Sequence, residues 1–216
     1  WQVAQTLTSM HASGRVDIPI VVGISSTLNR LGDYLPQKPM QSAEAQAFLK
    51  EQLRGNHWHY KEIASDRYLR YLVEVVKPFI DGNHRTKPEA STTGIMGSSM
   101  GGLISLYALC EYPQVFGLAG CLSTHWPITG KYMLDYLREH LPPAGTHKLY
   151  FDLGDQDLDA AYAPWQAQVD EILKEKGWEE NRDWQSWYFP SEGHHERFWA
   201  NRLHLPLGFL FPAETY

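Results

Sequence analysis

Short apolar runs alternate with amphipathic stretches along most of this chain. The apolar runs contain many β-branched and aromatic residues, and most lack the polar alternation of a strand with one solvated face. Strands with both faces buried, as in a parallel sheet covered by helices, have this composition. The predicted strands span residues 18–25, 92–96, 117–123, 148–153 and 185–189.

Helical periodicity fills the intervals between these runs. Gly14 and Gly177 follow two helical stretches as stop signals, and Pro78 is expected to kink or end the helix that contains it. Strands alternating with helices predict an α/β fold, with a mostly parallel sheet and helices on both faces. The predicted helices lie within residues 3–10, 41–54, 68–79, 103–110 and 164–173.

Length and composition restrict the class of protein. A chain of 216 residues is long enough for a single domain with a sizeable core. No apolar run approaches the roughly 20 residues of a membrane helix, and a net charge of −6 disfavours a nucleic-acid partner, because such partners are bound through clustered Lys and Arg. Cys110 and Cys121 each lie in an apolar run, which favours buried free thiols over a disulfide. The cellular compartment stays open.

A candidate nucleophile follows the second predicted strand. Residues 97–101 read Gly-Ser-Ser-Met-Gly, a G-x-S-x-G motif that leads directly into an apolar helix. A serine raised on a sharp strand-to-helix turn needs small neighbours, and Gly97 and Gly101 are expected to supply that room. The motif favours Ser99 as the nucleophile over Ser98, which is one residue out of register.

A serine nucleophile needs a base and an acid that orients the base. Loops after the last two predicted strands offer both, in the chain order serine, acid, histidine. The base is His194 or its neighbour His195. The acid lies on the loop that carries Asp155, Asp157 and Asp159, whereas Asp152 lies within a strand and is expected to be structural.

The chain resembles the putative esterase family of α/β-hydrolases, which includes esterase D, feruloyl esterases and enterochelin esterases. The resemblance extends over nearly the whole chain and is carried by PIVVGI with Arg30, Asp33, Tyr34 and Pro36, by KPFID at 77–81, GSSMGGL at 97–103, EYPQVFG at 111–117 and GHHERFW at 193–199.

This resemblance implies a role for each site residue. A Trp five positions after the histidine, here Trp199, selects His194 over His195, and a G-x-x-D pattern from Gly154 selects Asp157 as the acid. The family further implies that the backbone amide of Met100 donates to the oxyanion. The expected activity is a serine carboxylesterase with a small, short-chain ester substrate and no cofactor; an acyltransferase and a catalytically silent binding relative are the alternatives.

The resemblance also has a gap at the start of the chain. Families of this fold take a second oxyanion amide from the loop before the first helix, and that helix is expected to begin almost at Trp1. We therefore expect an upstream segment or a second copy to complete the sheet. His125 and Trp126 are weaker candidates for the acyl pocket. His57 and His59 have the spacing of metal ligands but lack a suitably spaced third ligand, so no metal site is expected.

Overall fold

The computed structural model describes residues 1–55, 58 and 60–213. Within them, four strands form one parallel sheet in the order β1-β2-β3-β4. The registers pair Ser98 with Leu122, Leu122 with Asp152, and Leu153 with Tyr188, so all four strands end at the same edge. The strands are β1 (Gly94–Ser98), β2 (Leu118–Leu122), β3 (Lys148–Leu153) and β4 (Trp184–Tyr188).

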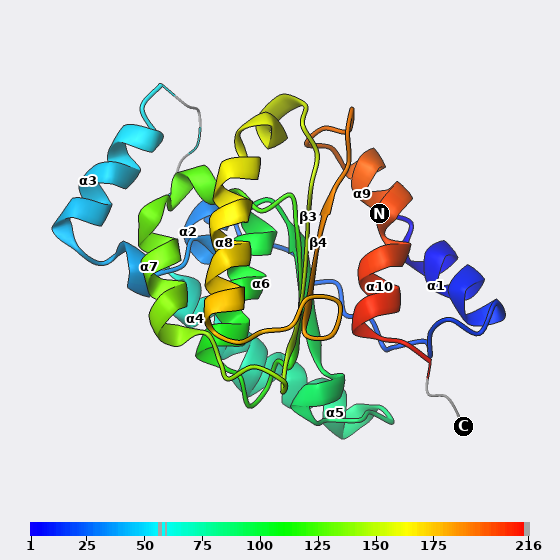
Figure 1. Ribbon diagram of the computed structural model, residues 1–216. Helices are drawn as coiled ribbons and strands as arrows, with labels where there is room; N and C mark the ends of the chain where they lie inside the picture. The colour runs from blue at the N-terminus through cyan, green and yellow to red at the C-terminus, as the bar shows by residue number, and fades with distance from the viewer. Residues whose placement is uncertain (56–57, 59, 214–216) are drawn as a thin grey trace.

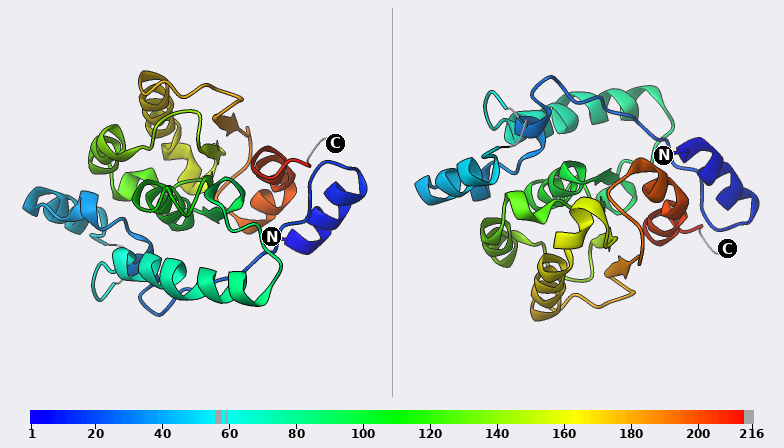
Figure 2. Two further views of the ribbon diagram at one scale, coloured as in Figure 1. Left: turned by 90° about the horizontal axis from the view of Figure 1, so that it is seen from below. Right: turned by 90° about the horizontal axis from the view of Figure 1, so that it is seen from above.

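Helices cover both faces of this sheet (Figure 1). Helices α6, α7 and α8 lie on one face, and α1, α9 and α10 lie on the other; Figure 2 shows the same layers from below and above. The helices are α1 (Val3–Ala12), α2 (Arg30–Tyr34), α3 (Ala43–Gln52), α4 (Ser65–Tyr71), α5 (Lys77–Asn83), α6 (Met100–Glu111), α7 (Lys131–His140), α8 (Ala163–Glu175), α9 (Glu196–Arg202) and α10 (His204–Leu210), with short helical turns η1 (Lys38–Met40), η2 (Leu72–Val76), η3 (Ala90–Thr92), η4 (Trp126–Ile128) and η5 (Asp157–Ala161).

The core explains why the central elements are apolar throughout. All five residues of β2 are buried, and in α6 every residue from Met100 to Cys110 is buried. A helix enclosed on all sides has no need of a polar face, so it has no amphipathic pattern. Cys110 and Cys121 are buried free thiols within this core, as the sequence predicted.

The strand boundaries predicted from the sequence agree closely with those of the sheet. The prediction for β3 is confirmed at both ends, and β2 and β4 are confirmed with boundaries shifted by one residue. Strand β1 begins at Gly94 rather than at Thr92, because residues Ala90–Thr92 form the turn η3. The α/β-hydrolase fold class is therefore confirmed, with helices on both faces of a parallel sheet.

The predicted strand at 18–25 is wrong. These residues form no strand, and the side chains of Ile18, Ile20, Val21 and Val22 are between 42% and 55% exposed. A β-rich sequence becomes a strand only when a neighbour satisfies its backbone hydrogen bonds. Among the described strands, β1 lies at the edge of the sheet and pairs only with β2. A row of exposed aliphatic residues and an open sheet edge therefore occur in the same molecule.

The helix that contains Pro78 is interrupted but does not end there. The π-helical turn η2 immediately precedes α5, which includes Pro78 near its start and continues to Asn83. A wider turn accommodates a residue that lacks a backbone N–H and crowds the preceding turn. Val75 and Phe79, on either side of Pro78, are 52% and 62% exposed. No helix in the described part of the chain is both long and apolar enough to cross a membrane.

Candidate active site

Ser99 occupies a strained turn between β1 and α6. Its backbone has φ 61° and ψ −122°, a region that residues with side chains rarely adopt. The amide of Ser99 donates to the carbonyl of Leu122, and the Ser99 carbonyl accepts from Gly102, Leu103 and His125. Contacts from both β2 and α6 thus hold the strained residue in place, with its side chain part-buried at the end of the strand.

The two glycines of the motif have different surroundings. A Cβ added at Gly97 would lie 2.8 Å from the backbone carbonyl carbon and oxygen of Gly101, which is closer than real Cβ atoms approach. A Cβ at Gly101 would meet nothing within 4 Å. The expectation that both glycines make room for the turn is therefore right for Gly97, whereas the space beside Gly101 is open.

Met100 is the first residue of α6. The first amides of a helix have no partner within the helix, and the helix dipole adds partial positive charge at this end. The amide of Met100 therefore directly follows the candidate nucleophile with the polarity that would stabilise a negative oxygen.

His194 forms a short hydrogen bond with Asp159, with 2.6 Å between Nδ1 and Oδ1. The side chain of His194 is 10% exposed and that of Asp159 is fully buried. Burial opposes ionisation of Asp159, but hydrogen bonds from His194, Ser123 and Gly154 outweigh it and hold the pKa of Asp159 below its usual value. Because the carboxylate only accepts, Nδ1 of His194 carries its proton and Nε2 is left free to accept one.

This contact favours Asp159 over the predicted acid, Asp157. Asp157, which the family pattern selected, is exposed and lies at the start of η5 with a positive φ of 56°. Its Oδ2 lies beside Gly193, where an added Cβ would approach it to 2.3 Å. The short turn η5 carries Asp159, two residues further on, inward to His194. Spacing along the loop could not reveal this, because the direction of each side chain depends on how the turn winds.

A buried network holds Asp159 in place. Oδ2 of Asp159 accepts hydrogen bonds from the hydroxyl of Ser123, at 2.6 Å, and from the amide of Gly154, at 2.8 Å. The Ser123 hydroxyl in turn accepts from Trp199 Nε1, at 2.9 Å, and from Arg202, at 3.0 Å. The carboxylate is thus fixed from two sides, which fixes the imidazole that it orients.

Ser123 and Arg202 were not among the residues predicted from the sequence. Arg202 is 2% exposed and donates to both carboxylate oxygens of Asp152 at 2.9 and 3.1 Å. A carboxylate inside the apolar strand 148–153 could have signalled this partner, because a buried charge requires an opposite charge close by. Asp152 is structural, as predicted.

His195 has a different position from His194. It is the N-cap of α9, where its Nδ1 accepts from the Arg197 amide at 3.1 Å, and its side chain is 60% exposed. The geometry therefore agrees with the family pattern in favouring His194 as the base.

Ser99 and His194 lie at the same edge of the sheet and are bridged by His125. The amide of His125 donates to the Ser99 carbonyl at 3.3 Å, and the centres of the His125 and His194 rings are 6.5 Å apart. Among the described residues, the Ser99 hydroxyl forms no hydrogen bond with His194. Such contacts are often long until substrate binds.

The two residues predicted to line the acyl pocket have different surroundings. His125 lies beside His194, and its Nδ1 is 2.5 Å from the Tyr162 hydroxyl. Trp126 is 1% exposed, donates to Gln166 at 3.2 Å and packs against Phe151. The expectation that Trp126 lines the pocket is therefore wrong, because η4 turns its side chain into the core.

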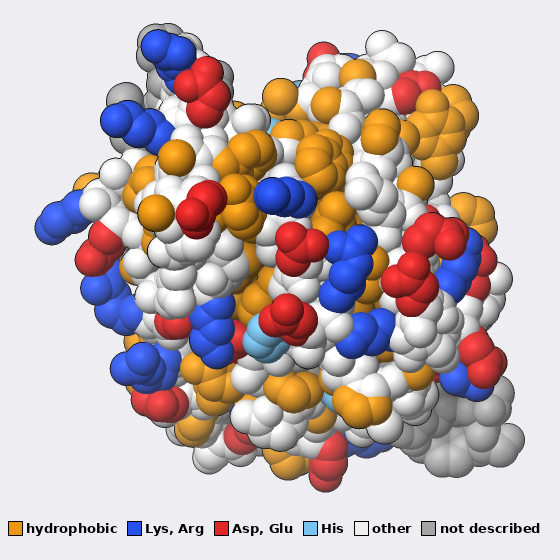
Figure 3. Space-filling view, turned by 60° about the vertical axis from the view of Figure 1, so that its left-hand side comes forward, with side chains coloured by type: hydrophobic (Ala, Val, Ile, Leu, Met, Phe, Trp, Pro, Cys, Tyr) orange, Lys and Arg blue, Asp and Glu red, His pale blue; other side chains and the backbone are white. Residues whose placement is uncertain are grey.

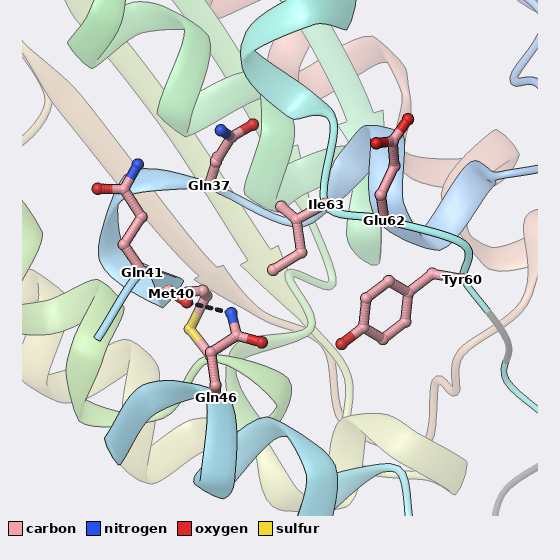
Figure 4. A pocket seen from close by; sticks show the side chains of 7 residues that line it. All are labelled: Gln37, Met40, Gln41, Gln46, Tyr60, Glu62 and Ile63. Atoms are coloured by element: carbon pink, nitrogen blue, oxygen red, sulfur yellow. Dashed lines mark hydrogen bonds between the residues drawn. The ribbon is translucent and has the colours of Figure 1, made fainter. Parts of the chain in front are cut away.

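The molecular surface is hollowed at the end of the sheet that carries these residues. Figure 3 shows a notch in the upper rim with apolar side chains below it, and interspersed acidic and basic side chains over the same face. A separate shallow pocket of about 370 Å³ lies between η1, α3 and residues 60–63 (Figure 4). Ser99, Asp159 and His194 do not line this pocket. Gln46 reaches across one side of it to the Met40 carbonyl.

His57 and His59 lie outside the described residues. Within the described part of the chain, no group of three or more His, Cys, Asp or Glu side chains is arranged to hold a metal ion.

Comparison with known proteins decides the family. The family model described as "Putative esterase" matches residues 1–200 of the chain. The chain belongs to the Putative esterase family. Within this family, the motif around Ser99 and the His194–Asp159 pair lie in the matched region.

The chain covers only part of the length of its relatives. The chain is 26% identical over 189 residues to the uncharacterized protein YbbA of Bacillus subtilis, covering 82% of this chain and 68% of YbbA. An IroE-like serine hydrolase from Shewanella oneidensis has a TM-score of 0.68, with 18% identity over 96% of this chain and 65% of that one. Enterochelin esterase from Shigella flexneri has a TM-score of 0.63 with 17% identity, over 94% of this chain and 45% of that one. These structures show that the fold is shared, and the chain spans about half to two thirds of their length.

Proposed function

We propose that this member of the Putative esterase family is a serine carboxylesterase that cleaves small carboxylic esters, with Ser99 as nucleophile, His194 as base and Asp159 as the acid that orients the base. The observation that carries the proposal is the combination of a strained Ser99 at the head of α6 with a His194–Asp159 hydrogen bond at the same sheet edge. A turn that served only the fold would not need both a strained serine and a histidine–carboxylate pair beside it.

The proposed reaction has two steps. In the first, Ser99 Oγ attacks the ester carbonyl and passes its proton to Nε2 of His194, which then gives that proton to the departing alcohol as the acyl-enzyme forms. In the second, water attacks the acyl carbon, His194 takes a proton from the water, and Ser99 regains its proton as the acid departs. Asp159 holds the imidazole in the required tautomer and stabilises its positive charge, and no cofactor takes part.

The oxyanion of each step would be bound at the start of α6. The amide of Met100 is the donor that this chain offers there, with the helix dipole behind it. Donors of this kind are worth about 10² to 10³ in turnover. Ester substrates suit the proposal because structures of related proteins are described as enterobactin and ferulic acid esterases.

Hydrolysis of 4-nitrophenyl butyrate tests the proposal. We expect the wild type to release nitrophenolate and Ser99→Ala to fall to the rate of the buffer, with Ser98→Ala as the matched control close to wild type. Equal rates for the wild type and Ser99→Ala would refute the esterase and favour a silent binding relative. Product analysis with a competing alcohol separates the hydrolase from an acyltransferase, since a transferase would yield the new ester.

We also propose that an apolar strand completes the sheet beside β1, supplied by further polypeptide of the same protein or by a second copy. The open edge of β1, the exposed aliphatic residues 18–22 and the exposed Val75 and Phe79 support this. Hydrogen exchange of residues 94–98 tests it: the 216-residue chain at low concentration should exchange fast, and the completed form slowly. Equal exchange in every form, at monomeric mass, would contradict the proposal.

A further inference from the structure

His125 is a buried imidazole beside the proposed triad that the reaction above does not use. It follows β2 directly, is 6% exposed, and binds the Ser99 carbonyl through its own amide. Its ring lies 6.5 Å from that of His194 and 5.1 Å from that of Trp58, centre to centre. A polar ring in this position adjoins whatever molecule reaches Ser99.

The hydrogen bond with Tyr162 fixes where the proton of His125 lies. Tyr162 is fully buried, and within the described residues its hydroxyl has no other acceptor than Nδ1 of His125, 2.5 Å away. A buried hydroxyl hydrogen requires an acceptor, so Tyr162 donates to Nδ1. A neutral imidazole that accepts at Nδ1 carries its hydrogen on Nε2.

The Nε2–H group is left available for a ligand. It has no hydrogen-bond partner in the described part of the chain. The described polar atoms that are both buried and without a partner are Ser65 Oγ, Tyr150 Oη and Trp184 Nε1, and Nε2 of His125 is not one of them. The atom therefore reaches the molecular surface although the rest of the ring is covered. Trp58, 39% exposed, stands edge-on to the same ring.

His125 also stays uncharged while it donates. Burial and the neighbouring His194 lower the pKa of His125 to about 4, so the ring is neutral at neutral pH. A neutral ring does not oppose the positive charge that acyl transfer would place on His194.

From these contacts we infer that His125 is a specificity residue: its Nε2–H donates to an oxygen of the substrate, so that the site prefers esters carrying an oxygen acceptor close to the scissile carbonyl. Tyr162 is the positioning residue that sets the tautomer. The inference rests on the proposed function, since it assumes that the ester is cleaved at Ser99.

Isosteric ester pairs test this preference. On the acyl side, 4-nitrophenyl methoxyacetate differs from 4-nitrophenyl butyrate by one oxygen in place of a methylene group; on the alcohol side, 2-methoxyethyl butyrate differs from butyl butyrate in the same way. For at least one pair, we expect His125→Phe to lower the ratio of kcat/KM for the oxygen ester to that for its isostere by about three- to tenfold, the effect of one neutral hydrogen bond. Intrinsic ester reactivity cancels when the variant is compared with the wild type.

Two further variants separate recognition from folding. His125→Gln keeps a donor and should restore part of the ratio, whereas a general packing defect would lower kcat/KM for both members of a pair equally. Tyr162→Phe frees the tautomer and should weaken the preference less than His125→Phe. The ¹⁵N spectrum of the wild-type ring should show hydrogen on Nε2, a readout that needs no activity.

The outcomes distinguish this inference from the proposed function. Ratios unchanged in both pairs by His125→Phe, with butyrate still cleaved through Ser99, would overturn the role of His125 alone. Hydrogen found on Nδ1 would overturn it as well. Hydrolysis independent of Ser99 would instead refute the proposed function, whatever the tautomer.

Discussion

Replacing Asp159 with asparagine distinguishes the carboxylate that contacts His194 in the structure from the acid that the sequence favoured. The Asp159 carboxylate accepts three hydrogen bonds, from His194, Ser123 and Gly154, at 2.6, 2.6 and 2.8 Å. In Asp159→Asn, one side-chain oxygen can still accept from Ser123 and Gly154. The amide nitrogen then faces Nδ1 of His194 as a donor and favours the tautomer with hydrogen on Nε2, which cannot take the proton of Ser99.

The expected loss is large in turnover and modest in stability. A wrong histidine tautomer in a serine triad costs about 10⁴ in kcat, which corresponds to about 5 kcal/mol of transition-state stabilisation. The free energy of unfolding should fall by about 1–3 kcal/mol, the worth of a hydrogen bond to a charged group. Turnover of 4-nitrophenyl butyrate gives kcat, and urea unfolding gives the stability.

Asp157→Asn is the matched control on the same loop. Asp157 is exposed and the hydrogen bond of His194 goes to Asp159, so the Asp157 variant should stay within about threefold of wild-type kcat. The reasoning is refuted if Asp157→Asn loses 10³ or more while Asp159→Asn remains active.

Three other predictions follow from the structure. Gly97→Ala should destabilise the chain by about 1–3 kcal/mol and reduce esterase activity, because its Cβ would meet the Gly101 backbone at 2.8 Å. The control Gly101→Ala should unfold at the same or a higher urea concentration than the wild type, and equal effects of the two substitutions would contradict the different surroundings of the two glycines. Arg202→Met should lower the free energy of unfolding by about 3–5 kcal/mol, because it leaves Asp152 buried without its cation. The control Arg70→Met, on the surface of α4, should change this free energy by under about 0.5 kcal/mol, and similar values for both variants would argue against a buried pair. The folded-state pKa of His125 lies near 4, below its ordinary value of 6.5, so its contribution to the free energy of unfolding is fully present above pH 6.5. That contribution, on the order of 3 kcal/mol, is lost as the pH falls toward 4. Urea unfolding across this range should show a flatter pH dependence for His125→Phe than for the wild type, and identical slopes would count against a buried neutral ring.

The sequence alone determined the features that depend on local composition. Strands β2 and β3 follow from apolar runs, because a strand buried on both faces tolerates few polar residues. Ser99 could be proposed as the nucleophile because a serine on a sharp strand-to-helix turn needs glycine at position 97 and a helix directly after it. The expected order of serine, acid and histidine came from the fold class, and the sequence supplied candidate residues in that order.

Only the tertiary structure decided which side chains meet. Asp155, Asp157 and Asp159 are equivalent as letters on one loop, and the winding of η5 turns Asp159 toward His194 and leaves Asp157 at the surface. Ser123 and Arg202 join the site from positions 36 and 43 residues away from Asp159, which no local pattern records. The segment 18–25 has the composition of a strand but remains unpaired, because a strand exists only where another strand satisfies its backbone hydrogen bonds.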